Sequence, residues 1–213
     1  MNKSPEFTIA IESAISGGSL SLLRGDVEIA SWIGESNVSK AEDLLFNIDL
    51  LLRENDVSKR DIGFLAVSAG PGSFTGIRIG IATALGLKAG LGIEMSSESA
   101  FKAIAFAAES AGDVTVALPV GRNAVCIQKF AAGARASCPP DIGDPNTVTE
   151  EEFISMIPSN FTTTFLVHER LYEKAEMPSN VINVGLGLAS AVGRICQLYR
   201  GVVVEPLFIS KSF

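Results

Sequence analysis

Residues 68–80 read Ser68-Ala69-Gly70-Pro71-Gly72-Ser73-Phe74-Thr75-Gly76-Ile77-Arg78-Ile79-Gly80 and join a predicted buried strand to a predicted long helix. This junction is the strongest local indication of the fold. Residues 61–68 are mostly apolar and predict a central strand, and residues 75–90 predict a helix. Glycine at such a junction permits backbone angles and close approaches that other residues avoid. A strand, a glycine-rich turn and a helix in this order are typical of an α/β protein.

The glycine-rich loop leaves two interpretations open. The free N–H groups and the dipole at a helix N-terminus attract anions, so the loop could bind phosphate. A Walker A loop is excluded because Ile77 stands where that motif needs lysine, and a nucleophile elbow is excluded because Pro71 replaces its first glycine. The alternative is a tight strand-to-helix turn. The residues of this loop that would serve either role are Gly70, Gly72, Ser73, Thr75 and Gly76.

The helix after the loop carries small residues at a helical spacing. Gly76, Gly80 and Ala84 recur every fourth position and therefore share one face. Glycine inside a helix costs ~0.5–1 kcal/mol relative to alanine, so a compensating contact is expected. We expect a groove that admits a second helix, and we favour a helix of a partner over one of the same chain.

Residues 39–55 predict a second amphipathic helix. Ser39 and Glu42 form a capping-box pattern at its start. Phe46 and Leu50 form a smaller apolar stripe that is either a wider core contact or a partner surface. The main apolar face, at helical spacing, comprises Leu44, Leu45, Ile48, Leu51 and Leu52.

The remaining chain reads as alternating strands and helices. Three strands, at 7–13, 19–24 and 27–33, predict an antiparallel meander. We expect two lobes, residues 1–105 and residues 106–213, with the C-terminal segment packing back towards the first. The further expected elements are a helix at 98–110 capped by Ser96 or Ser97, strands at 114–120 and 124–130, a loop at 131–149, a short helix at 150–157, strands at 163–167 and 180–184, and a helix at 186–199.

Composition sets limits on the class of protein. Of 213 residues, 47% are hydrophobic and 19% are charged, which excludes a disordered chain. The net charge of -7 and the absence of basic runs argue against binding RNA alone. Three cysteines without a C-x-x-C motif, no signal-like N-terminus and no uninterrupted apolar span of membrane length predict a cytoplasmic protein that contacts no membrane.

Few residues offer catalytic or metal-binding chemistry. His168 is the only histidine, so a paired-histidine metal site is excluded, and we expect it at the surface. Glu12, at the end of the first strand, could bind magnesium, act as a base or cap the turn that follows. Residues 150–152, three glutamates, favour a helix N-terminus. No catalytic residue and no metal ligand is assigned.

The stretch from Ser68 to Gly80, continued by Ala82-Thr83-Ala84-Leu85-Gly86-Leu87, resembles the signature of the TsaB (formerly YeaZ) family. The segments 96–105, 9–13 and 206–209 also resemble that family. Three positions depart from it. Glu12 stands where the family usually has aspartate, Val38-Ser39 where it has His-Ser, and residues 119–122 where it commonly has Asp-Ala-Arg.

The resemblance implies a fold and a function. The fold is a two-lobed, actin-like and Hsp70-like ATPase (ASKHA) fold with ribonuclease-H-like topology. The function is that of a glycoprotease-like, non-catalytic subunit for threonylcarbamoyladenosine (t6A) modification of tRNA. Its partners would be the catalytic paralogue TsaD, which uses a metal held by histidines, and the ATPase TsaE. It would form a homodimer when alone and reach tRNA only through the complex.

The two helices described above are the surfaces that we would assign to this pairing. A metal-dependent peptidase or a small-molecule kinase on the same fold remains as an alternative, the kinase with ATP or ADP at the glycine-rich loop. No cofactor is assigned, and nucleotide binding stays open. The residues assigned to the partner contact are Leu44, Phe46, Ile48, Leu50, Gly76, Arg78, Gly80, Thr83 and Ala84.

Overall fold

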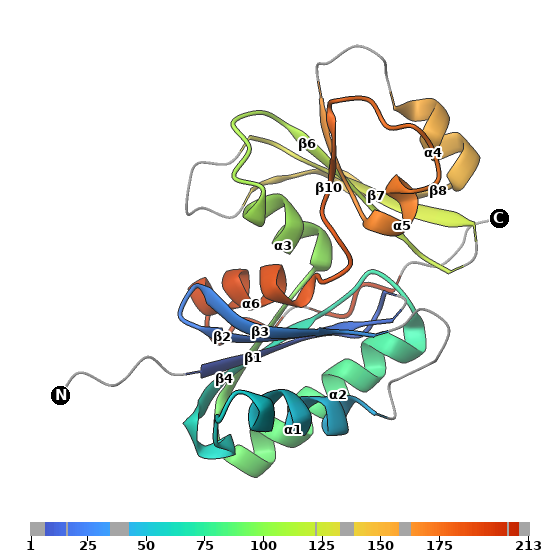
Figure 1. Ribbon diagram of the computed structural model, residues 1–213. Helices are drawn as coiled ribbons and strands as arrows, with labels where there is room; N and C mark the ends of the chain where they lie inside the picture. Colours follow the sequence, from blue (N-terminus) through green and yellow to red (C-terminus); the bar gives the residue numbers. More distant parts are fainter. Residues whose placement is uncertain are drawn as a thin grey trace.

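Two five-stranded sheets, each with its own helices, form two lobes stacked on one another (Figure 1). The computed structural model describes residues 7–15, 17–34, 43–121, 123–132, 139–157, 163–203 and 205–208. The expected cap at Ser39 and Glu42, together with Val38, lies outside these residues.

The first sheet has the strand order β3-β2-β1-β4-β5. The expected meander is confirmed, because β1 pairs antiparallel with β2 and β2 with β3, whereas β4 and β5 run parallel to β1. The strands are β1 (Phe7–Glu12), β2 (Ser19–Arg24), β3 (Val27–Ile33), β4 (Ile62–Ser68) and β5 (Glu94–Glu98).

One strand of this sheet was not expected from the sequence. Ser96 and Ser97 lie within β5, where they were expected to cap a helix. The cap is Ser99, whose hydroxyl accepts a hydrogen bond from the Lys102 N–H at 3.2 Å at the start of α3 (Ala100–Ala107). A short polar segment with two serines has low strand propensity, and it becomes a strand because it pairs with the buried β4.

The second sheet repeats the plan of the first. Its order, β10-β9-β6-β7-β8, again combines three antiparallel strands with two parallel ones. This arrangement confirms an α/β fold of two mixed sheets with ribonuclease-H-like topology. The strands are β6 (Val114–Pro119), β7 (Ala124–Phe130), β8 (Asp141–Thr149), β9 (Thr164–Val167) and β10 (Val181–Asn183).

Strand β8 corrects the expectation of a loop at 131–149. Gly143 and Pro145 suggested a loop, but proline and glycine are tolerated in an edge strand beside a bulge. The register between β7 and β8 shifts between Ile127 and Lys129, which leaves this part of β8 out of regular pairing. The Gln128 side-chain amide donates to the Gly143 carbonyl at 2.8 Å and replaces a ladder bond there.

The helices cover three surfaces (Figure 1). Helices α1 (Leu44–Glu54) and α2 (Phe74–Leu91) lie on the outer face of the first sheet, with the short helix η1 (Lys59–Asp61) between them in sequence. Helix α3 and the C-terminal α6 (Ala189–Leu198) lie between the two sheets. Helices α4 (Glu150–Met156) and α5 (Glu169–Tyr172) pack on the second sheet.

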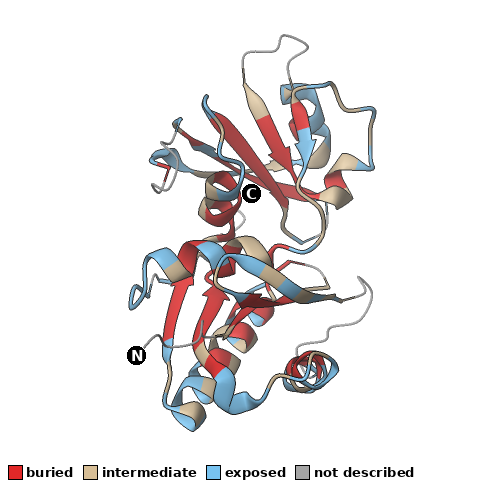
Figure 2. Ribbon diagram, turned by 60° about the vertical axis from the view of Figure 1, so that its left-hand side comes forward, coloured by how far each residue is buried: buried red, intermediate tan, exposed pale blue. Residues whose placement is uncertain are grey.

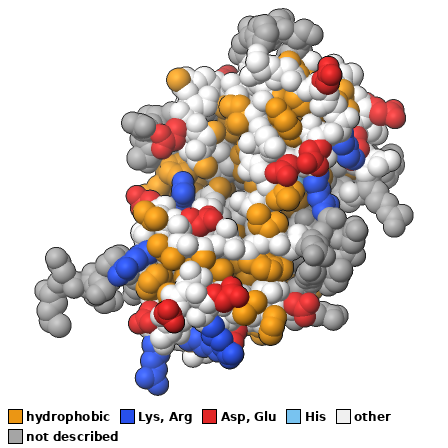
Figure 3. Space-filling model, in the orientation of Figure 1, with side chains coloured by type: hydrophobic (Ala, Val, Ile, Leu, Met, Phe, Trp, Pro, Cys, Tyr) orange, Lys and Arg blue, Asp and Glu red, His pale blue; other side chains and the backbone are white. Residues whose placement is uncertain are grey.

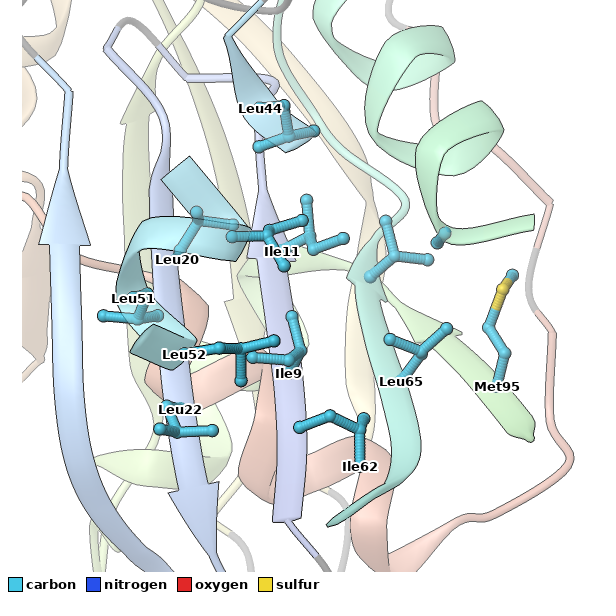
Figure 4. Close-up of a cluster of buried hydrophobic side chains, with 13 residues drawn as sticks. Ile9, Ile11, Leu20, Leu22, Leu44, Leu51, Leu52, Ile62, Leu65 and Met95 are labelled. Carbon is cyan, nitrogen blue, oxygen red and sulfur yellow. The ribbon is translucent and has the colours of Figure 1, made fainter. Parts of the chain in front are cut away.

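Apolar clusters join these layers, and the buried residues run through both lobes (Figure 2). On the outer face of the first sheet, Ile9 and Leu65 belong to the same apolar cluster as Leu51 of α1 (Figure 4). On its inner face, Ala10 and Phe64 pack against Val192 of α6. The last helix of the chain therefore forms part of the core of the first sheet.

Helix α2 is the only helix among the described residues that is long and apolar enough to cross a membrane. It packs on the first sheet through Ile77 and Ala84, both of which are fully buried. Arg78 and Lys88 interrupt its apolar sequence. We therefore describe it as a surface helix of a globular lobe.

A capping box at the start of α4 offers a small, local test of this fold. The Thr149 hydroxyl accepts from the Glu152 N–H at 3.1 Å, and the Glu152 carboxylate accepts from the Thr149 N–H at 2.8 Å. Thr149→Ala is expected to lower the free energy of unfolding by about 1 kcal/mol, whereas Thr149→Ser keeps the hydroxyl and should cost little. Urea unfolding of both variants measures this, and equal losses would contradict the cap.

Candidate functional site

The turn after β1 is held by the buried carboxylate of Glu12. One oxygen, Oε1, accepts the N–H groups of Ala14 at 2.7 Å and Ile15 at 3.0 Å. Glu12 is only 1% exposed, and burial raises its pKa to about 7 against the opposing effect of these two hydrogen bonds. Glu12 therefore caps this turn. The sequence left three roles open for Glu12, namely a magnesium ligand, a base and a cap, and the cap is the structural one.

The glycine-rich loop packs against the same turn. The Ser73 N–H donates to the Ala14 carbonyl at 2.7 Å, and the Ser73 hydroxyl accepts from the Gly76 N–H at 3.3 Å. The Gly70 N–H donates to the Ser68 hydroxyl at 3.2 Å. Because protein groups already occupy these donors, the geometry favours a tight strand-to-helix turn over a phosphate site.

The stripe of small residues on α2 faces the protein's own interior. A Cβ added to Gly76 would lie 2.1 Å from the Ser13 carbonyl oxygen, and one added to Gly80 would lie 2.2 Å from the Ser13 Oγ. Ala84 is fully buried in the core of the first lobe. The expectation of an open groove at these three residues is therefore wrong, because the turn after β1 and the sheet fill it.

Helix α1 divides the residues that the sequence assigned to a partner. Leu44 and Ile48 are each only 4% exposed and belong to the core, so they do not present a partner surface. Phe46 is 67% exposed and Leu50 is 37% exposed. Leu45, expected on the buried face, is 56% exposed and joins the outer stripe.

Helix α2 adds further groups to this outer side of the lobe. Leu85 is exposed, Thr83 is half-buried, and the exposed Arg78 guanidinium lies 3.7 Å from the centroid of the Phe74 ring. We call Leu45, Phe46, Leu50 and Leu85 the outer apolar face of α1 and α2. Figure 3 shows hydrophobic side chains open on the lower lobe, interspersed with acidic and basic groups.

A pocket lies between α1, α2 and the first sheet. Ile48, Leu52, Leu87 and Leu91 are among the apolar residues that line it. Its rim carries Asp49, which pairs with Lys59 and with Arg53, each at 2.7 Å. The hydrogen bond from Lys59 holds the pKa of Asp49 below its usual value. The ion pairs of Asp49 with Lys59 and Arg53 thus border the apolar lining of the pocket.

The single histidine is buried, which corrects the expectation of a surface position. His168 is 1% exposed, and its Nδ1 accepts from the Arg170 N–H at 3.3 Å at the start of α5. Burial, followed by the Arg170 charge, lowers its pKa to about 4. Within the described ranges, no group of three His, Cys, Asp or Glu residues could hold a metal ion.

The two described cysteines and the acidic run lie where the sequence predicted them. Cys126 and Cys196 are free and buried, as a core position predicts, and Cys138 lies outside the described residues. Glu150, Glu151 and Glu152 form the first turn of α4, as expected from the helix dipole. Ser73 and Thr75 are exposed at the start of α2, and Gly72 is half-buried against the Ala14 carbonyl.

Comparison with known proteins gives matches over part of the chain. Residues 37–137 match the family model described as TsaD, tRNA N6-adenosine threonylcarbamoyltransferase. The chain is 31% identical over 97 residues to the tRNA threonylcarbamoyladenosine biosynthesis protein TsaB of Bacillus subtilis, covering 46% of this chain and 42% of that protein. It is 46% identical over 50 residues to TsaB of Buchnera aphidicola, covering 24% and 23% of the two chains. The matches thus span less than half the length of these relatives.

Solved structures agree in fold over nearly the whole chain. YeaZ from Pseudomonas aeruginosa superposes with a TM-score of 0.65 at 17% identity, covering 91% of this chain and 92% of that one. A protein described as similar to peptidase YeaZ from the same organism gives a TM-score of 0.66 and covers 95% and 100% of the two chains, also at 17% identity. The motif at residues 68–87, the sequence matches and this shared fold together support a TsaB/YeaZ family protein.

Proposed function

We propose that the chain is an accessory, non-catalytic subunit in t6A biosynthesis, and that it pairs with a TsaD-like catalytic paralogue through the outer apolar face of α1 and α2. The observation that carries the proposal is this face, on a chain whose curated relatives are named for t6A biosynthesis. A TsaE-like ATPase would join the pair. The complex would work in the cytoplasm and would supply the contact with tRNA, with no membrane involved.

The outer apolar face has the properties of a partner contact. Three of its four side chains share α1, and a group of exposed apolar residues marks an interaction site more often than an isolated residue does. Aromatic residues commonly anchor such contacts, so Phe46, the most exposed of the four, is the expected anchor. Arg78 and Thr83 extend the contact along α2.

The chemistry of the described site supports an accessory role. Glu12 and Ser73, two of the polar side chains at the glycine-rich loop and the turn that it packs against, are both engaged in holding turns. His168 is buried against the start of α5 in the second lobe. An accessory subunit that holds its partner in place, and supplies no reacting groups, needs only a rigid lobe and an exposed surface for the partner.

Replacing Phe46 tests the pairing directly. Phe46→Asp is expected to weaken binding of a purified TsaD-like paralogue by more than about thirtyfold, because loss of an anchor costs roughly 2 kcal/mol or more. Val27→Asp is the matched control, since Val27 is similarly exposed at 62% but lies on β3. Calorimetry with both variants measures the affinities. Equal affinities for wild type and Phe46→Asp would contradict the assigned face.

The same variant also tests pairing with a second copy of this chain. Without the paralogue, the outer apolar face is expected to form a symmetric homodimer, as exposed apolar helix faces often do. Sedimentation of the wild type should then show a dimer that Phe46→Asp converts to a monomer. A wild type that stays monomeric at high concentration, and that binds no paralogue, would contradict the proposal.

A further inference from the structure

The C-terminal segment, Gly201–Val203 and Glu205–Phe208, returns to the first lobe after α6. Its first part runs beside β5, the edge strand of the first sheet. The Gly201 N–H donates to the Ser96 hydroxyl at 2.8 Å, the Ser97 N–H donates to the Val202 carbonyl at 3.0 Å, and Val203 forms a parallel bridge with Ser97. The segment therefore covers part of an otherwise open sheet edge.

Its second part meets the glycine-rich loop. The Leu207 N–H donates to the Ala69 carbonyl at 2.7 Å, and a Cβ added to Gly70 would lie 3.0 Å from the Leu207 carbonyl oxygen. Gly70 has a φ of +100°, so glycine serves both the backbone conformation and the close approach. The loop thus presents a carbonyl acceptor and a bare surface to this segment.

Side chains at the end of the segment bind both lobes. The half-buried Leu207 packs against the cluster that contains Ile15 of the first lobe and Leu118 of the second. The Phe208 ring lies 4.7 Å from the Phe74 ring, centroid to centroid, and Arg78 lies over Phe74. These contacts fall on the first turn of α2.

We propose that residues 69–74 form a binding site whose ligand is the chain's own C-terminal segment, a short apolar peptide centred on Leu207 and Phe208. The bound segment fixes the first turn of α2 and links it to the core between the lobes. The site is therefore occupied by peptide at a loop for which the sequence left phosphate binding and a tight turn open. This assignment is independent of the proposed pairing with a paralogue.

Hydrogen exchange on the full-length protein without a partner tests this assignment. Both Leu207→Ser and Phe208→Ala are expected to weaken the docking of the segment. The amides of residues 69–77 should then exchange roughly tenfold faster, the size expected when detachment of the segment removes one backbone hydrogen bond or one aromatic contact. Amides of β1 and of β6 should keep their wild-type protection. Leu45→Ser is the matched control, because Leu45 is exposed on α1 and away from the segment.

Two outcomes would overturn the assignment. The first is unchanged exchange of residues 69–77 in both variants, which would mean that the loop holds its shape alone. The second is equal acceleration in both sheets, which would mean that Leu207 is an ordinary core residue. Acceleration confined to the loop and the first turn of α2 supports it, whether or not a paralogue binds the outer face.

Discussion

Gly76→Ala is expected to lower the free energy of unfolding by roughly 3 kcal/mol, near the upper end of the cost of overpacking. The new methyl carbon would lie 2.1 Å from the Ser13 carbonyl oxygen, which is a backbone atom and cannot rotate away. The first turn of α2 must then separate from the turn after β1. Urea unfolding followed by circular dichroism measures the loss.

Gly86→Ala is the matched control on the same helix. Beyond the chain neighbours and the helix's own backbone, no atom lies within 4 Å of a Cβ added at Gly86, so the variant gains helix propensity without a clash. It is expected to raise the free energy of unfolding by about 0.5–1 kcal/mol. If both variants changed stability in the same direction, the packing of Gly76 on Ser13 would be wrong. Gly80→Leu should likewise disturb the fold itself, because its Cβ would meet Ser13.

Glu12→Gln is expected to remove a pH dependence of stability that the wild type has between about pH 4.5 and pH 7. The native pKa of about 7 lies above the ordinary value of 4.5, so the native state binds more protons than the unfolded state in this range. The free energy of unfolding of the wild type therefore falls as pH rises, by roughly 3 kcal/mol in total at 1.36 kcal/mol per pKa unit. The neutral amide of glutamine has no such dependence.

Glutamine also keeps the contact that shapes the turn. Both N–H groups are accepted by Oε1, an atom that glutamine retains. Unfolding in urea across a pH series should show Glu12→Gln gaining on the wild type from pH 5 to pH 8. Glu54→Gln, at an exposed position on α1, is the control and should run parallel to the wild type. Parallel curves for Glu12→Gln as well would show that the carboxyl is not protonated on folding.

Sequence and structure agree where local signals are strong. The opening meander, the strand at residues 62–68 and α2 were all predicted, because apolar periodicity and a glycine-rich junction are local properties of the chain. Strands β5 and β8 were missed for the opposite reason. Their residues have weak strand propensity, and each becomes a strand by pairing with a buried neighbour.

The candidate site shows the same division. Spacing placed Gly76, Gly80 and Ala84 on one face of a helix, which is correct, but spacing cannot say what that face meets. Only the tertiary structure put Ser13 there, turned Leu45 outward and buried His168. For Glu12 the sequence offered a cap or a reacting group, and the hydrogen bonds to Ala14 and Ile15 decided for the cap.

Local sequence patterns predicted the α/β class and the order of most elements, and the motif at residues 68–87 predicted the resemblance to the TsaB/YeaZ family. The tertiary structure decided which apolar residues face solvent and what occupies the glycine-rich loop. Those outcomes depend on contacts between residues more than a hundred positions apart, such as Ala69 with Leu207. Such contacts form only when the chain closes on itself, and no local pattern encodes them.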